Sequence, residues 1–169
     1  MTISIKESQL KQAAEEGYDA FVGIVIQTIK HAIGGELNVN NMQQLNSDQI
    51  TLLAWDVLHT EVMDGGLIQL IHNGYGPFIY KNPTAQAFRA WELFDLFRWV
   101  RRSHGLWRKY RERIECDCTE DEFMALFEQM PEFDDFDDMF VEKEEEWTKL
   151  IAHYLDDHLS HFVTVDVVA

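Results

Sequence analysis

The chain has 169 residues, a formal net charge of −16 at pH 7 and an apolar content of 46%. This length allows one compact domain with a buried core, and the apolar content, which includes eleven Phe and five Trp, excludes intrinsic disorder. No apolar run is long enough to cross a membrane and no signal-peptide pattern begins the chain, so we expect a cytoplasmic protein without membrane contacts.

The first half of the chain is predicted to be helical, because its apolar residues recur mostly at intervals of three and four. Helices are expected over residues 8–16, 18–33, 48–63 and 67–73. Asn46 and Gln49 have the spacing of a capping pair at a helix N-terminus. Gly65-Gly66 predicts a break between the last two helices, and Gly74–Pro77 predicts a turn after them.

The second half of the chain has the same helical spacing. Helices are expected over residues 84–103, 119–130 and 134–162. A further helix that ends at residue 114 is expected after a break at His104-Gly105. Thr119 and Glu122 form a predicted capping box, and residues 163–168 alternate weakly, as in a short strand or a frayed tail. The sequence therefore predicts an all-α fold. We expect a single compact multi-helix domain over residues 1–169, with a long C-terminal amphipathic acidic helix.

Charge is segregated along the sequence. Residues 115–157 contain seventeen of the thirty carboxylates but only two of the fourteen Lys and Arg residues, whereas residues 89–113 contain eight basic residues and three acids. The densest acidic cluster is the candidate partner-binding surface and has eight members: Asp134, Asp135, Asp137, Asp138, Glu142, Glu144, Glu145 and Glu146.

Four of these acids form a row on the predicted helix over residues 134–162. Asp135, Asp138, Glu142 and Glu145 share one face at rises of about 4.5–6 Å. Each strand of duplex DNA places a phosphate every ~3.4 Å, so the row presents a comparable line of negative charge to a protein that binds phosphates. The alternative interpretation is a solvated helix face whose acids serve only solubility.

Two further patterns have simpler interpretations. Aromatic residues alternate with the bases of residues 89–113, as in nucleic-acid-binding grooves. Because the net negative charge opposes direct binding of nucleic acid, we expect these bases to brace the acidic helices and cover aromatic rings. His153, Asp157 and His161 recur at intervals of four, which is a spacing of metal ligands, but no second ligand helix accompanies them. We predict no metal, cofactor or catalytic residue, with a metal-dependent enzyme as the alternative.

The most specific pattern lies at the expected break between helices. Two adjacent glycines are typical of a close-packed junction, in which Asp64 caps the next helix and Glu61 and Gln69 bond exposed backbone groups. The members of this structural motif are Glu61, Asp64, Gly65, Gly66, Gln69, Asn73 and Gly76. They resemble the Glu-x-x-Asn-Gly-Gly-Phe-x-Gln-x-x-x-Asn pattern of the bacterial DNA-mimic protein family of the nineteen-kilodalton type, with Asp64 in place of Asn and Leu67 in place of Phe.

The resemblance runs from about residue 45 to 162, with residues 1–44 expected to form helices packed on that region. It implies an all-helical acidic domain and, for the member that gave the family its name, binding of a transcription factor in place of DNA. We therefore expect a non-enzymatic protein whose acids occupy the DNA-binding surface of a basic partner, and a homodimer is compatible with this role. The alternative is a structural or immunity-type interaction module that binds through Tyr75–Tyr80, with acids that serve only solubility.

Overall fold

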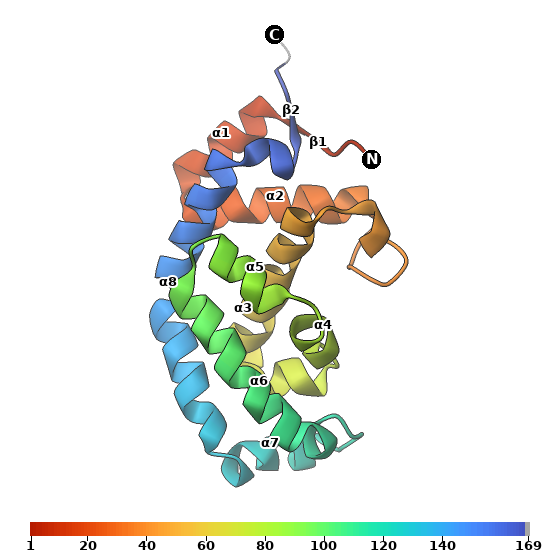
Figure 1. The fold of residues 1–169 in the computed structure, drawn as a ribbon, viewed down its shortest axis with the longest axis vertical. Helices are drawn as coiled ribbons and strands as arrows, with labels where there is room; N and C mark the ends of the chain where they lie inside the picture. The colour runs from red at the N-terminus through yellow and green to blue at the C-terminus, as the bar shows by residue number, and fades with distance from the viewer. Residues whose placement is uncertain (168–169) are drawn as a thin grey trace. The chain divides into compact units, whose positions relative to one another are not determined.

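The computed structural model describes residues 1–167, which are mostly helical (Figure 1). Within that range there are eight α-helices, two 3₁₀ helices and two three-residue strands, which confirms the predicted all-α fold. The chain divides into two compact units, one made of residues 1–53 and those from 145 onward, the other of residues 54–144. The single domain expected over residues 1–169 stays a prediction. None of the described helices is both long and apolar enough to span a membrane.

The first unit contains both ends of the chain. Its complete elements are β1 (Ser4–Lys6), α1 (Glu7–Glu16), α2 (Tyr18–Ala32), the 3₁₀ helices η1 (Met42–Gln44) and η2 (Leu159–His161), and β2 (Thr164–Asp166). The two strands pair in parallel, with Ile5 opposite Val165. β1 was not expected, because three residues are too few to show alternation. For residues 163–168 the sequence predicted either a short strand or a frayed tail, and β2 confirms the strand. Val168, the last residue of that range, lies outside the described residues.

Two predicted helix starts are confirmed. α3 (Ser47–His72) begins after Asn46, whose Oδ1 accepts from the Gln49 N–H at 2.9 Å, while the Gln49 Oε1 accepts from the Asn46 N–H at 3.0 Å. α7 (Glu120–Gln129) begins after Thr119, whose Oγ1 accepts from the Glu122 N–H at 3.2 Å. Both are reciprocal capping boxes, which act within four residues and are therefore readable from sequence.

The last long helix, α8 (Glu132–Asp157), is shorter than predicted. The expected end at residue 162 is wrong because the chain leaves the helix after Asp157 and buries Phe162, which is 1% exposed. The Gln49 Nε2 donates to the backbone oxygen of Phe162 at 2.8 Å and holds this turn in the first unit.

The second unit holds the helices that position the candidate site. It comprises α3 from residue 54, α4 (Gly76–Tyr80), α5 (Thr84–Ala90), α6 (Phe94–Ile114), α7 and the part of α8 up to residue 144. α6 and this part of α8 run side by side in opposite directions (Figure 1). Lys109 lies 3.2 Å from Glu132 near one end of the pair, and Asp95 lies 3.9 Å from Lys143 near the other.

The core of the second unit is rich in aromatic residues. Phe140 of α8 has no exposed surface, and its ring centroid lies 5.8 Å from that of Trp55 in α3 and 5.2 Å from that of Trp99 in α6. An aromatic pair contributes roughly 0.5–1.5 kcal/mol beyond the burial of its area. These contacts set the rotation of α8 about its own axis and so decide which of its acids reach solvent.

The predicted helix over residues 84–103 is wrong, since α5 and α6 are separate helices. Glu92 between them has a φ of 64°. The Leu93 N–H donates to the Phe88 oxygen and the Glu92 N–H to the Arg89 oxygen, both at 2.9 Å, which is a Schellman termination that normally uses Gly. Phe88 and Leu93 are buried, and their packing offsets the cost of a left-handed Glu.

The predicted break at His104-Gly105 is also wrong, because α6 continues through it. A glycine inside a helix costs roughly 0.5–1 kcal/mol relative to Ala. The next two residues, Leu106 and Trp107, are buried, and burial of a Leu side chain alone contributes roughly 1.5–3 kcal/mol. Packing of this helix face therefore outweighs the local preference of the glycine.

Candidate functional site

α3 is kinked at the adjacent glycines, which confirms the predicted break. Gly66 has a φ of 78° and a ψ of 178°, a conformation that is essentially restricted to glycine. A Cβ atom at this position would lie 2.5 Å from Oδ2 of Asp137 in α8. The backbone conformation thus requires glycine, and an added Cβ atom would also displace the Asp137 carboxylate.

Asp137 caps the helical segment that begins after the kink. Its Oδ1 accepts a hydrogen bond from the Leu67 N–H at 2.8 Å. The predicted cap by Asp64 is wrong, because the Asp64 Oδ2 instead accepts from the Gln69 Nε2 at 3.0 Å. Asp137 and Leu67 are seventy residues apart, so no local pattern marks their contact.

The other motif residues bond or contact side chains of the second unit. The Glu61 Oε2 accepts from the Gln69 Nε2 at 2.7 Å and from the Asn73 Nδ2 at 3.1 Å, in place of the expected bonds to backbone groups. A Cβ atom at Gly76 would lie 2.1 Å from the Trp107 Nε1, so this position also requires a glycine for close packing. Each of these contacts has an architectural role.

The surroundings of Asp137 raise the pKa of its carboxyl group to about 6. Burial is the main cause, and the negative charges of Asp134 and Asp138 add to it, whereas the hydrogen bond from Leu67 opposes it. Asp137 is directed at the kink rather than at solvent. It therefore contributes less to the surface charge than the sequence alone suggested.

Glu144 is the second partly enclosed member of the eight candidate acids. Its Oε1 lies 2.7 Å from the His59 Nε2, and its side chain is 18% exposed. The His59 ring in turn stacks on Trp55, with centroids 5.2 Å apart. Asp137 and Glu144 thus both contact other helices of the second unit.

The remaining six candidate acids are exposed on α8: Asp134, Asp135, Asp138, Glu142, Glu145 and Glu146. Within residues 1–167, no ion pair or side-chain hydrogen bond involves the first five of them. The first four belong to the second unit and the last two to the first. The second unit therefore carries four exposed carboxylates on α8 that no basic side chain neutralises by direct contact.

The basic stretch contacts α8 at the start of that helix. Lys109 pairs with Glu132, and the Tyr110 hydroxyl donates to the same carboxylate. The hydrogen bond from Tyr110 is the main cause of a lowered pKa of Glu132, and the bond from Lys109 adds to it. The Arg111 guanidinium lies 4.2 Å from the centroid of the Trp107 ring. The expected brace and ring cover are both present, but the brace holds Glu132 rather than the six exposed candidate acids.

The three residues considered as metal ligands have other neighbours in the first unit. The His161 Nδ1 lies 2.8 Å from the Asp48 Oδ2, and the His153 ring lies 5.4 Å from that of Tyr18. Because α8 ends at Asp157, His161 does not continue the same helix face. In the part of the chain that the structure describes, no three His, Cys, Asp or Glu side chains gather as metal ligands.

The segment Tyr75–Tyr80, considered for an interaction module, is largely enclosed. The Tyr80 hydroxyl donates to the Ser103 Oγ at 2.7 Å, and burial raises the pKa of Tyr80. Its ring stacks on Trp107 with centroids 5.3 Å apart, and Ile79 is 1% exposed. This segment packs into the second unit through Ile79 and Tyr80, while Tyr75 and Phe78 are half-buried.

The fold and these carboxylates define an acidic, all-α protein with exposed negative charge on one long helix. The chain belongs to the DMP19-like protein family, whose model matches residues 43–158. It is similar to the DNA mimic protein DMP19 of Neisseria meningitidis serogroup B (strain ATCC BAA-335 / MC58), with 31% identity over 123 residues that cover 72% of this chain and 74% of the relative. The family expected from the glycine motif is confirmed, and the matched range includes both that motif and the acids of α8.

Proposed function

We propose that this chain is a DNA mimic that binds a basic DNA-binding protein, such as a transcription factor, on the surface that otherwise contacts DNA. The similarity of the chain to a DNA mimic protein supports this class of function. The observation that carries the proposal is the set of exposed acids on α8 that have no ion-pair partner within residues 1–167. Binding alone blocks access to DNA, so the proposed function needs no cofactor and no catalysis.

Four acids of the second unit form the centre of the proposed surface: Asp134, Asp135, Asp138 and Glu142. From Asp135 to Glu142 they are spaced by three and then four residues, which is a rise of about 4.5–6 Å per step. Phosphates on one DNA strand are ~3.4 Å apart along the axis, and long Lys and Arg side chains accommodate the difference. Glu145 and Glu146 extend the acidic sequence on the same helix.

In this proposal, Asp137 and Glu144 do not contact the partner but fix the orientation of α8. Their bonds to Leu67 and His59, together with the Phe140 contacts, hold this part of α8 in one orientation within the second unit. A pre-ordered row of charge avoids the entropy cost of arranging flexible side chains and backbone when the partner binds. The enclosed acids thus support the exposed ones.

The competing explanation is that the exposed acids serve only solubility. Two carboxylates ~5 Å apart repel by about 0.8 kcal/mol even in bulk water, so a cluster of them has a cost that either solubility or a partner must offset. One version of this explanation has the protein bind a partner through Tyr75–Tyr80 instead. The burial of Ile79 and Tyr80 within that segment argues against this version. Charge reversal of individual acids separates the two explanations.

The test is capture of proteins from a lysate of the source organism on the immobilised chain at low salt. We expect DNA-binding proteins to be enriched, duplex DNA to displace them, and retention to fall steeply between about 50 and 200 mM salt, because ion pairs are screened. The purified partner is then titrated with the wild-type chain and with a double variant, Asp138→Lys with Glu142→Lys. This variant should bind at least tenfold more weakly.

The matched control is Glu15→Lys with Glu128→Lys, which changes the net charge equally. Both control residues are exposed acids in the last turns of other helices, α1 and α7, and neither is on α8. If both double variants weaken binding equally, net charge rather than this surface is responsible and the proposal is wrong. Absence of any DNA-binding protein among the captured proteins also contradicts it. Light scattering tests whether the chain forms the homodimer that is compatible with this role.

A further inference from the structure

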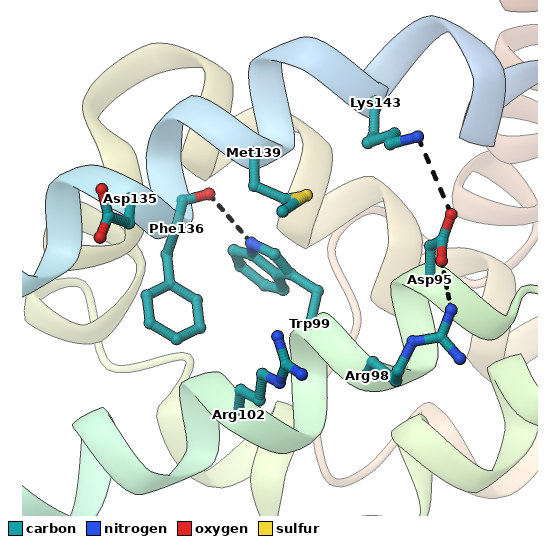
Figure 2. A pocket seen from close by; sticks show the side chains of 8 residues that line it. All are labelled: Asp95, Arg98, Trp99, Arg102, Asp135, Phe136, Met139 and Lys143. Atoms are coloured by element: carbon teal, nitrogen blue, oxygen red, sulfur yellow. Dashed lines mark hydrogen bonds and ion pairs between the residues drawn. The ribbon is translucent and has the colours of Figure 1, made fainter.

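A pocket of about 450 Å³ lies between α6 and α8 in the second unit (Figure 2). Its size is within the usual range of small-molecule sites. Both helices contribute to its lining: Asp95, Arg98, Trp99, Arg102, Asp135, Phe136, Met139 and Lys143. We refer to it as the α6–α8 pocket. The side chains of Trp99, Phe136 and Met139 give it an apolar surface, which favours a ligand with an apolar body.

The charge of the α6–α8 pocket is opposite in sign to that of the whole protein. Its lining has three cationic side chains and two acidic ones, which leaves a net charge of +1 in a chain of net charge −16. The local charge favours an anion.

One cation of the pocket is available to a ligand. Asp95 is bonded to Arg98 and lies 3.9 Å from Lys143, so these two cations have an acidic neighbour. Arg102, by contrast, forms no hydrogen bond or ion pair with any of residues 1–167. Figure 2 shows its guanidinium group pointing toward the space between Trp99 and Phe136.

The indole of Trp99 is not available as a second donor. Its Nε1–H donates to the backbone oxygen of Phe136 at 2.9 Å, which leaves the ring to provide apolar contact only. Arg102 is therefore the group that can bind an anionic head, and a planar guanidinium matches the two oxygens of a carboxylate. The aromatic and thioether groups beside it match a flat apolar body.

We propose that the α6–α8 pocket binds a small organic anion, in which a carboxylate pairs with Arg102 and a flat apolar body packs against Trp99, Phe136 and Met139. This proposal does not rest on the proposed DNA mimicry, because it requires no protein partner, although Asp135 belongs both to the pocket lining and to the proposed partner surface. Asp135 lies at the opposite end of the pocket from Asp95 (Figure 2). Its negative charge opposes the ligand, so the carboxylate is oriented toward Arg102 and away from Asp135.

The test uses 2-naphthoate as the probe and its neutral amide, 2-naphthamide, as the matched ligand. Calorimetric titration of the full chain should show saturable binding of 2-naphthoate, and the assigned indole N–H resonance of Trp99 should shift during the titration. The amide should bind at least tenfold more weakly, because it lacks the charge that Arg102 recognises. Equal affinity for acid and amide would mean that the pocket is merely apolar, and would overturn the proposal.

Variants locate the bound anion. Arg102→Gln should weaken 2-naphthoate binding about tenfold, whereas Arg108→Gln, an exposed arginine of α6 outside the pocket, should change it less than twofold. Asp135→Asn should tighten binding about twofold, because it removes a repulsive charge. Unchanged affinity in Arg102→Gln overturns the proposal, as does the absence of saturable binding at millimolar probe. If 2-naphthoate shifts the Trp99 resonance equally in the wild type and in Arg102→Gln, the ligand binds without help from Arg102. That result would also contradict the proposal.

Discussion

Asp137 and Asp138 are neighbours in α8 but belong to two different regions of the second unit. Asp137 lies against the Gly65-Gly66 kink, where it accepts a hydrogen bond from Leu67 and has a pKa raised to about 6. Asp138 is exposed and forms no ion pair within residues 1–167. Because successive residues of a helix point about 100° apart, one helix supplies both a structural carboxylate and a solvent-facing one.

The comparison shows that acids in one cluster are not equivalent. A cluster of eight carboxylates contains two, Asp137 and Glu144, that hold the second unit together, and six that are exposed. The enclosed pair contributes to the orientation of α8, whereas the exposed acids supply most of its surface charge. Substitutions at the kink should therefore change stability, and substitutions of exposed acids should change binding while stability is nearly unchanged.

The largest effect is expected at the kink itself. Gly66→Ala should lower the free energy of unfolding by about 3 kcal/mol or more, because it adds backbone strain of roughly 1–3 kcal/mol and places a methyl group against Asp137. Urea denaturation of the purified variant measures this change. The control is Gly23→Ala in α2, where the added carbon would meet no atom within 4 Å apart from its chain neighbours and the backbone of its own helix. That variant should gain roughly 0.5–1 kcal/mol, and a similar small change in both variants would refute the role of the kink.

An intermediate effect is expected for Asp137→Asn. The folded pKa of about 6 is above the usual value of 3.8, so the folded state holds this proton more tightly than the unfolded state does. The wild type should lose stability as pH rises from about 4 to 6, by about 1–2 kcal/mol after allowance for solvent screening. Asn keeps an acceptor for the Leu67 N–H without this titration, so the variant should be the more stable protein at pH 7.

The matched control for that titration is Asp138→Asn, one residue further along α8. This variant keeps Asp137, so it should still lose stability between pH 4 and 6, by somewhat less than the wild type because the Asp138 charge adds to the raised pKa of Asp137. Urea denaturation of the three proteins at several pH values provides the comparison. If the two variants behave alike, the distinction between the enclosed and the exposed carboxylate is wrong.

The smallest effect is expected for Asp138→Lys. The new side chain would lie four residues from both Asp134 and Glu142, and each such pair of opposite charges contributes roughly 0.2–0.5 kcal/mol. We expect a gain of about 0.5 kcal/mol in the free energy of unfolding that disappears in 1 M salt. A large loss of stability would instead mean that Asp138, like Asp137, is required by the fold.

Helix boundaries marked by a capping box or by two adjacent glycines were predicted correctly, whereas the lone glycine of His104-Gly105 predicted a break that is absent and two other helix ends had no local signal. Asn46 with Gln49 and the Gly65-Gly66 pair act on groups within a few residues, so their patterns were sufficient. The end of α5 at Glu92 has no glycine, and the end of α8 depends on burial of Phe162. Both ends are set by packing against distant parts of their units, which leaves no local pattern.

The sequence by itself determined the helical class, the family and the region of concentrated charge, because apolar spacing, a glycine motif and composition are all properties of short segments. Only the tertiary structure decided which of the eight acids are enclosed, that Asp137 rather than Asp64 caps the helix after the kink, and that Arg102 lies beside an apolar pocket. Each of these depends on a contact between helices far apart in the chain, such as that of Asp137 with Leu67 seventy residues away. Burial of this kind is a consequence of packing, which periodicity along one helix does not specify.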